Sequence, residues 1–299
     1  MSLLSPHVAA FIAVIEESSF EGAARKLSVT PSAISQRIKQ LEDRIGQLLV
    51  VRQSPCKPTP AGKQLLSRVK PMSLLEVEVM QELMPDNPQN KQPKTLSIAV
   101  NEDSLTTWLL DAVAALSTEY GYSFDIRVDD QECTLEHLKN GAVIGALTSE
   151  KTPLQGCVTH ALGCMKYCGI ASPEFYERYF SSGLTKEAFE KAPVIVYNRK
   201  DPLQTRFMET ITNTTIHPRN THYIPSAVSL VDAVKHHMGW CVTAEGLLGD
   251  SIERGQVVNI APELSLNEAL YWQHAGVRSQ VLSRVTKSFL SASAELLSN

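Results

Sequence analysis

The chain has 299 residues, of which 43% are hydrophobic, and a formal net charge of −4. That length and composition suffice for two or three globular domains. No apolar run approaches the roughly 18 residues that span a bilayer, and the N-terminus lacks a basic segment followed by a long apolar stretch. These observations exclude a membrane-spanning or secreted protein, so we expect a cytoplasmic one with no membrane partner.

The six cysteines are scattered and show no paired metal-binding spacing with histidine. Cys164 and Cys168 have the spacing of a conceivable redox pair, but reduced thiols are the more common state in a chain without a secretory signal. We therefore expect no metal and no cofactor.

Charge is distributed unevenly along the chain. Residues 1–70 contain ten Lys and Arg against five Asp and Glu, a net charge of +5. The remaining residues contain 18 basic against 27 acidic side chains, a net charge of −9. A basic N-terminal region on an acidic body is typical of a protein whose N-terminal region meets nucleic acid.

A helix-turn-helix is predicted between residues 19 and 46. Thr30 is placed to cap the second helix, Pro31 to occupy its first position, and Gly46 to end it. An apolar stripe of helical period then faces the core, and short polar side chains with a cation occupy another face. The predicted stripe consists of Ile34, Ile38, Leu41 and Ile45.

Amides and hydroxyls on such a helix are suited to base edges in the major groove, and cations to phosphates. Residues 48–52 resemble a short strand, and 53–58 a stiff turn, so residues 1–59 are interpreted as a winged helix-turn-helix. An ordinary amphipathic helix with a solvated polar face is the alternative. The candidate DNA-binding residues are Thr30, Pro31, Ser32, Ser35, Gln36, Arg37, Lys39, Arg52 and Lys57.

A long helix is predicted over residues 60–84. Its apolar residues recur at mixed three-, four- and seven-residue spacing, which favours pairing with the same helix of a second subunit. Packing of this stripe on its own chain is the alternative. The polar, proline-containing segment 85–93 is predicted to be a hinge. The predicted seam consists of Leu65, Val69, Met72, Val79 and Leu83.

From residue 94 the pattern becomes alternating strands and helices, which indicates an α/β domain with a parallel sheet. Strands are expected at 95–100, 124–128 and 141–147, and helices from Ser104 to about Tyr120 and at 135–140. A second lobe is expected over 164–268, with strands at 193–197 and 239–243. The chain then returns to the first lobe, made of 94–163 and 269–299, with a final helix from about Gln280. Ligands in such folds bind at strand ends, between the lobes.

A set of residues in the N-terminal region and in three later segments follows the pattern of a known family. They are Ser19-Phe20, Ala23-Ala24, Leu27, Thr30, Ser32 to Glu42, Gly46, Leu49, Arg52, Thr59, Gly62, Leu96 to Leu110, Lys191 to Val194 and Leu270 to Trp272. On these residues the chain resembles the LysR-type transcriptional regulators along its full length. Within that family it is similar to the ArgP branch of lysine- and arginine-responsive regulators, also described as inhibitors of chromosome initiation. The resemblance implies a periplasmic-binding-like effector domain, a homodimer or tetramer, double-stranded DNA as partner and contact with RNA polymerase.

A candidate effector site lies where the first strand of this region meets its helix. With Ser104 as the expected N-cap, free backbone amides are predicted to receive a carboxylate. Asp103 and the pair Asp129 and Asp130 are predicted to meet ammonium groups, and Trp108 to stack on the ligand. Equally open are readings of Asp103 as a cap, Trp108 as core and the pair as a solvated loop. The candidate effector residues are Asn101, Asp103, Ser104, Thr107, Trp108 and Asp130.

An enzyme is the main alternative in another class. The sequence has no glycine-rich nucleotide-binding loop, no HExxH and no GxSxG, and we expect no catalytic residues. Two further alternatives are an amino-acid-binding component of a transporter and a LysR-type regulator with a different small-molecule effector.

Overall fold

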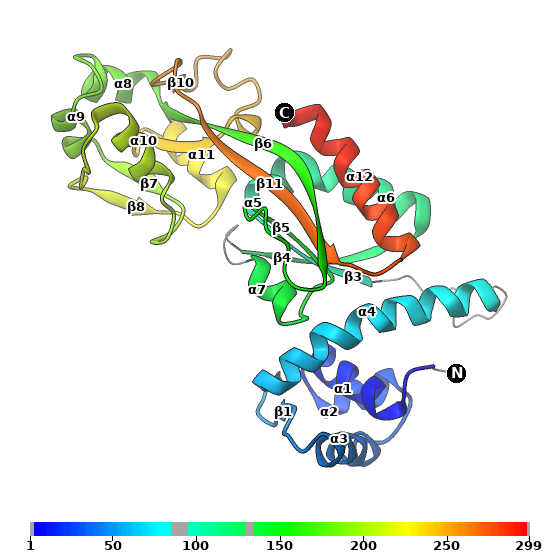
Figure 1. Ribbon diagram of the computed structural model, residues 1–299. Helices are drawn as coiled ribbons and strands as arrows, with labels where there is room; N and C mark the ends of the chain where they lie inside the picture. Colours follow the sequence, from blue (N-terminus) through cyan, green and yellow to red (C-terminus); the bar gives the residue numbers. More distant parts are fainter. Residues whose placement is uncertain (1–2, 85–94, 130–133, 298–299) are drawn as a thin grey trace. The chain divides into compact units, whose positions relative to one another are not determined.

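The computed structural model describes residues 3–84, 95–129 and 134–297 (Figure 1). Contacts divide the chain into two compact units, and the predicted hinge at 85–93 lies outside the described residues. The division differs from the predicted domains, whose boundaries stay a prediction. The first unit consists of Met1–Val100, Ala115–His160 and Trp272–Lys287, and the second of Asn101–Ala114, Ala161–Tyr271 and Ser288–Asn299.

The N-terminal head of the first unit is a winged helix-turn-helix, as predicted. Its strands β1 (Val50–Val51) and β2 (Lys57–Pro58) pair antiparallel to form the wing. Ile34 and Ile38 are fully buried in the core of the head, but Ile45 is 41% exposed, so its place in the predicted stripe is wrong. Ile45 is the last helical residue, where the helix has left the core. The helices are α1 (Pro6–Glu17), α2 (Phe20–Lys26) and α3 (Pro31–Ile45).

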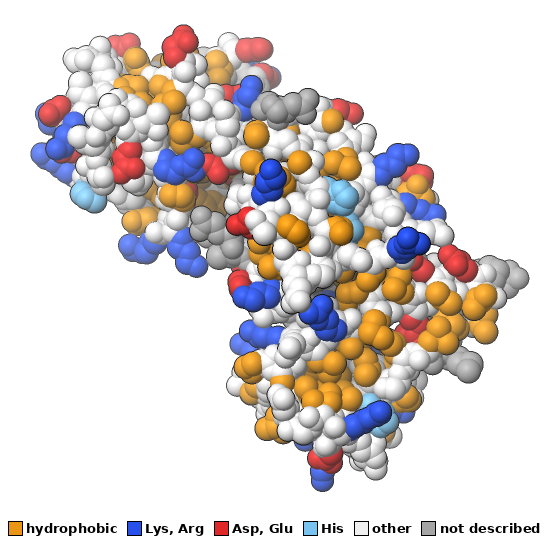
Figure 2. All heavy atoms as spheres, in the orientation of Figure 1, with side chains coloured by type: hydrophobic (Ala, Val, Ile, Leu, Met, Phe, Trp, Pro, Cys, Tyr) orange, Lys and Arg blue, Asp and Glu red, His pale blue; other side chains and the backbone are white. Residues whose placement is uncertain are grey.

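Helix α4 (Pro60–Leu83) runs above the three head helices in Figure 1. Leu65 and Val69 pack into the core of the head, so the prediction that they face a second subunit is wrong. The remaining seam residues Met72, Val79 and Leu83 are 51%, 38% and 72% exposed. Figure 2 shows hydrophobic side chains on this face toward the C-terminal end of α4. The predicted stripe therefore divides between packing on its own chain and an uncovered half.

The first unit also contains the expected parallel strands. Strand β3 (Thr95–Val100) pairs in parallel with β4 (Ser123–Val128) and with β5 (Gly145–Thr148). Helix α7 (Thr134–Lys139) leads into β5. The strand predicted from residue 141 begins four residues later, because Gly141 turns the chain at a left-handed φ of 68°.

Strand β6 (Cys157–Ala171) starts in the first unit and continues in the second. The last helix of the chain likewise begins in the first unit and ends in the second. In the second unit β6 pairs antiparallel with β9 (Cys241–Ala244) and β10 (Val258–Asn259). A separate parallel pair is formed by β7 (Val194–Val196) and β8 (Thr221–Tyr223).

The last strand, β11 (Leu266–Ala275), lies between β6 and β5 in the order of the main sheet, and the helices complete the α/β region. The segment 102–120 is continuous helix, with a π-helical stretch between two α-helical ones. The bounds of the helices are α5 (Glu102–Ser104), η2 (Leu105–Leu109), α6 (Leu110–Tyr120), α8 (Pro173–Phe180), α9 (Lys186–Lys191), α10 (Leu203–Thr212), α11 (Ala227–Lys235), η3 (Glu245–Leu247) and α12 (Gln280–Leu296).

The predicted fold class is confirmed: a winged helix-turn-helix and a long helix are followed by an α/β region. The expected start of the final helix at Gln280 is confirmed as well. Among the helices that the structure describes, none has the length and apolar character needed to cross a membrane.

Candidate functional site

The candidate DNA-reading helix α3 has the boundaries that its sequence predicts. Thr30 accepts a hydrogen bond from the backbone N–H of Ala33 at 3.2 Å, and Pro31 occupies the first turn. Gly46 ends the helix at φ 77°, a left-handed conformation that glycine adopts without a Cβ clash. Ser32, Gln36 and Lys39 are exposed, whereas Ser35 and Arg37 are half-buried. The polar face is thus free for a partner of the head.

The wing is anchored by a buried carboxylate. Glu42, 6% exposed, accepts hydrogen bonds from the backbone N–H groups of Leu49 and Val50 at 2.8 and 3.2 Å. Arg52 Nη2 lies 3.5 Å from Glu42 Oε2, and its guanidinium carbon is 5.5 Å from the centre of the Phe20 ring. The Arg52 side chain is still 49% exposed, so it serves the head's own structure and keeps surface for a phosphate. Lys57 is exposed on β2.

The candidate effector segment begins its helix earlier than expected. Asn101, not Ser104, is the N-cap residue, and Leu105 N–H donates to the Asn101 carbonyl at 3.2 Å. Ser104 has helical backbone angles, so the expected cap at Ser104 is wrong. The acidic side chains of Glu102 and Asp103 favour this earlier start because they lie in the first turn, at the positive end of the helix dipole. The unpaired backbone N–H groups of the first turn are therefore those of residues 102–104, earlier in the chain than the sequence predicted.

Three polar side chains of this segment are buried without a hydrogen-bond partner among the described residues. They are the amide of Asn101, the hydroxyl of Ser104 and the indole N–H of Trp108. Buried polar groups in folded proteins nearly always have a partner, so three within two helical turns indicate a site that a ligand or water completes. The π-helical stretch at Leu105–Leu109 falls in the same segment, and such stretches are frequent at functional sites.

Trp108 is part of the hydrophobic core. Its side chain is 1% exposed, and its ring meets Phe289 edge to face with centroids 6.0 Å apart. The alternative interpretation of Trp108 as a core residue therefore describes its ring. Thr107 donates its hydroxyl to the Asp103 carbonyl at 2.6 Å, and its methyl group lies 3.1 Å from where a Cβ on Gly246 would be.

Asp103 lies in an acidic, desolvated environment. Tyr167 donates its hydroxyl to Asp103 Oδ2 at 2.7 Å. Burial raises the pKa of Asp103 to about 6, the Tyr167 hydrogen bond opposes this shift, and the charges of Asp201 and Glu102 add to it. The pKa of Tyr167 lies well above its ordinary value, first through burial and then through the charge of Asp103. A cation beside this carboxyl would relieve both shifts.

Sequence reasoning missed three polar residues of the second unit near this carboxyl or buried beside its sheet. Tyr167 lies within β6 and gives no local signal. Asp201 follows β7 and accepts the Leu203 N–H at 3.0 Å; the rule that ligand groups follow strand ends would have found it. Gln204 is 2% exposed, and no described residue donates a hydrogen bond to its side-chain oxygen.

Of the acidic pair after β4, the structure describes only the first residue. Asp129 Oδ2 lies 3.0 Å from Nε2 of His137, and both residues belong to the first unit. Asp130 lies outside the described residues.

Two family profiles match the chain. Residues 6–63 match the bacterial regulatory helix-turn-helix protein, lysR family, and residues 89–294 match the LysR substrate binding domain. The HTH-type transcriptional regulator ArgP of Photobacterium profundum is 38% identical, over 97% of each chain. The regulator LysG of Mycobacterium tuberculosis is also 38% identical, over 97% of this chain and 94% of that one.

Solved structures give the same assignment. The crystal structure of ArgP from Mycobacterium tuberculosis has a TM-score of 0.87 and 36% identity, and covers 99% of both chains. Full-length LysG from Corynebacterium glutamicum with bound effector Arg has a TM-score of 0.77 and 31% identity, over 99% of this chain and 100% of that one. The chain belongs to the LysR family of bacterial helix-turn-helix regulators.

Proposed function

We propose that this LysR-family regulator binds double-stranded DNA through α3 and the wing and responds to a basic amino acid, lysine or arginine. Similarity over nearly the whole length to regulators named ArgP and LysG supports this, as does the LysG structure with bound arginine. The relatives are transcriptional regulators, so the chain's own output is binding and not turnover.

The acidic environment of Asp103 is the observation that carries the effector proposal. Asp103 and Asp201 raise each other's energy when both are ionised, and the Tyr167 hydroxyl on β6 donates a hydrogen bond to Asp103 on α5. An ammonium or guanidinium group neutralises such a pair and donates hydrogen bonds that the carboxylates accept. A neutral or acidic effector gains nothing from this arrangement.

The unpartnered groups of the helix start support the other end of the ligand. Asn101 and Ser104 together offer an amide and a hydroxyl, next to the first-turn amides of 102–104. These are donors suited to an α-carboxylate at a helix N-terminus. A basic amino acid carries both required charges in one molecule.

The assembly proposal rests on the uncovered half of α4. Met72, Val79 and Leu83 present apolar surface in one chain, which a second copy of α4 would cover. A homodimer, or a tetramer built from it, places two α3 helices on one DNA site. Effector binding then shifts the population of DNA-binding arrangements, and RNA polymerase is the partner that reads the result.

Calorimetric titration of the full chain tests the effector. We expect arginine or lysine to bind saturably, and citrulline and norleucine, which lack the cationic end, to bind at least tenfold more weakly. Asp103→Asn keeps the side-chain shape and should weaken arginine about tenfold or more, the range of a charge-assisted hydrogen bond of ~1.5–3 kcal/mol, while citrulline changes little.

Glu102→Gln is the matched control, since it removes a neighbouring first-turn charge. Equal losses for arginine and citrulline in Asp103→Asn would assign Asp103 to helix capping. Absence of binding by either basic amino acid would refute the effector proposal and leave DNA binding to be judged by a mobility-shift assay.

A further inference from the structure

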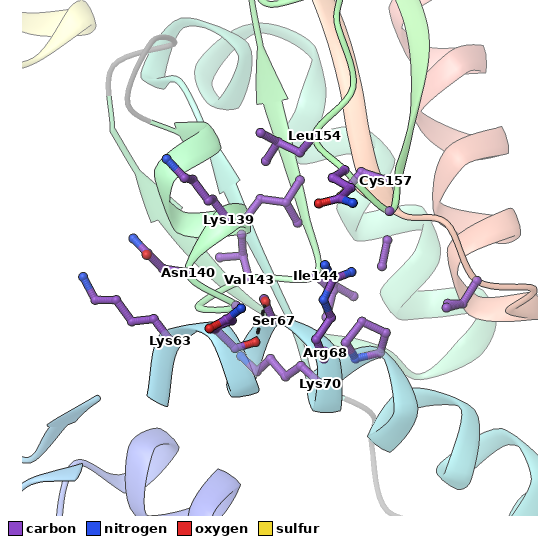
Figure 3. A pocket seen from close by; sticks show the side chains of 18 of the residues that line it. Lys63, Ser67, Arg68, Lys70, Lys139, Asn140, Val143, Ile144, Leu154 and Cys157 are labelled. Atoms are coloured by element: carbon purple, nitrogen blue, oxygen red, sulfur yellow. Dashed lines mark hydrogen bonds between the residues drawn. The ribbon is translucent and has the colours of Figure 1, made fainter. Parts of the chain in front are cut away.

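A cavity lies within the first unit, between α4 and the body of its α/β sheet. It has a volume of about 710 Å³, a size that suits a metabolite. Figure 3 shows α4 forming one side, with α7, the turn before β5 and the start of β6 opposite. None of the candidate effector residues that the structure describes lines it.

Two backbone contacts hold this cavity in shape. Gly141 comes so close to α4 that a Cβ would lie 2.3 Å from the Ser67 nitrogen, which leaves glycine as the only fitting residue. Beside it, the buried Lys70 amine donates to the Ala142 carbonyl at 2.8 Å. The wall made by α4 is therefore docked onto the body at a fixed place.

A second set of hydrogen bonds between α4 and the α/β body lies further along the helix. Glu78, 8% exposed, accepts hydrogen bonds from the Ser279 hydroxyl at 2.6 Å and from the backbone N–H groups of Gln280 and Val281 at 3.2 and 2.9 Å. The carboxylate thereby caps α12 from another helix. Because α4 is fixed at two points, the cavity between it and the body is preformed and does not depend on a ligand to shape it.

The charge of the cavity is of one sign. Its lining contains four cations and, among the residues that the structure describes, no carboxylate. In Figure 3 Arg68 extends from α4 into the hollow, whereas Lys63 and Lys139 reach toward its rim. Lys139 pairs with Glu136 at 3.1 Å, and burial lowers the pKa of Lys70. Arg68 has no ion-pair partner in the described part of the chain, so its charge faces the cavity uncompensated.

The remaining lining offers hydrogen bonds on one side and apolar contact on the other. Ser67 and Asn140 supply polar groups beside Arg68, and Leu138, Val143 and Leu154 form an apolar wall. Gly156 leaves room for the guanidinium, since a Cβ there would lie 3.0 Å from Arg68 Nη1. A planar guanidinium with free donors is the side chain that binds carboxylate or phosphate in bidentate fashion.

We propose that this cavity binds a small organic anion bearing carboxylate or phosphate groups, with Arg68 as its principal contact. The positive lining repels a basic amino acid, so this ligand differs in charge from the proposed effector. Since the walls come from α4 on one side and the α/β body on the other, an anion that contacts both strengthens their docking. A ligand at this site thus acts on α4, the helix that carries the head, in addition to the effector.

Titration of the full-length protein with citrate, succinate, inorganic phosphate and pyrophosphate tests the proposal. Calorimetry and thermal unfolding are run at constant ionic strength, with chloride as the monovalent reference, because screening alone changes surface charges. We expect saturable binding and a raised Tm with at least one multivalent anion. Comparison of the carboxylate and phosphate arms identifies the chemistry.

Variants separate the cavity from general charge effects. Arg68→Gln should weaken the anion about tenfold or more, whereas Arg68→Lys, which keeps the charge, should lose less. Lys63→Gln with Lys139→Gln should weaken it by a smaller factor, and the exposed Arg219→Gln of the second unit should have no effect. Arginine affinity should be the same in all of them, which makes the two sites separable.

Two results would overturn the proposal. One is the absence of saturable binding by every multivalent anion in the panel. The other is binding that Arg68→Gln leaves unchanged. If instead Arg68→Gln weakens DNA binding and no anion binds, these cations serve DNA phosphates and the cavity has no ligand of its own.

Discussion

The head and the start of the α/β region treat their polar groups in opposite ways. In the head, Ser5, Ser19, Thr30 and Thr59 each cap a helix by accepting a backbone N–H at 3.3, 2.9, 3.2 and 3.0 Å. The buried Glu42 likewise accepts two backbone N–H groups. The hydrogen bonds of the head maintain its own shape.

Residues 101–108 differ in this respect. Asn101 and Ser104 are as buried as Glu42, yet their side-chain polar atoms make no hydrogen bond within the part of the chain that the structure describes. Unsatisfied buried groups cost stability, and they persist where another function requires them. The head is therefore organised to present a fixed surface, and the 101–108 segment to receive a ligand.

The largest effect is expected at Glu42. Glu42→Leu leaves the N–H groups of Leu49 and Val50 without an acceptor and should cost about 3 kcal/mol of unfolding free energy. The unfolding transition of the head in urea measures this loss of free energy, and DNA affinity should fall together with stability. Asp43→Asn, exposed on the same helix, is the control and should change the free energy by less than about 0.5 kcal/mol. A small effect at Glu42 would contradict the view that the head is held by its own hydrogen bonds.

Asp103 should make stability depend on pH. Its folded-state pKa of about 6 lies above the ordinary 3.8, so the folded state holds the proton more tightly. The resulting stability is fully present below pH 3.8 and is lost as pH rises through 6, by about 2 to 3 kcal/mol in total. Unfolding of wild type and Asp103→Asn across pH 4–8 measures it, and the variant should lack this component.

The same shift applies to ligand binding. A cationic effector favours the ionised carboxyl, so its affinity should rise between pH 5 and 7 and level off above that. Parallel pH profiles in wild type and Asp103→Asn would show that the carboxyl does not face the ligand.

On the exposed face of α3 the expected effect concerns DNA. Gln36→Ala should cost about 2 kcal/mol of binding to the preferred operator and relax preference at one base position, as loss of a base contact does. Lys39→Ala should weaken all sequences alike and lower the salt dependence, since it removes a phosphate contact. Fluorescence anisotropy at several salt concentrations distinguishes the two. Unchanged preference in Gln36→Ala would mean that another face of α3 reads the bases.

The smallest effects are expected from a matched pair of substitutions that each remove a hydroxyl group. Thr30→Ala removes a satisfied cap and should cost about 1 kcal/mol of unfolding free energy. Ser104→Ala removes a buried hydroxyl that has no partner, so it should cost less than about 0.5 kcal/mol or stabilise the fold. Thermal unfolding compares them, and Ser104→Ala should weaken the effector. Equal costs would show that Ser104 has a structural bond in solution and would remove the contrast between the two regions.

Elements with local signals could be predicted from the amino-acid sequence. Thr30 and Pro31 start α3 and Gly46 ends it, because caps and left-handed residues act within one turn of the chain. The alternation of strands and helices after residue 94 likewise predicted the parallel pairs that β3 forms with β4 and β5. Residue type and spacing carry this information without reference to distant parts of the fold.

The neighbours of those elements depend on long-range packing and could not be predicted in this way. Val69 has the same spacing signal as Val79, yet the head buries the first and leaves the second 38% exposed. Tyr167 reaches Asp103 across 64 residues, and Glu78 caps a helix 201 residues away at Ser279. A periodic pattern shows that a face is apolar or a group is polar, but the partner is set by long-range packing, which decides whether a buried carboxyl caps a helix or awaits a ligand.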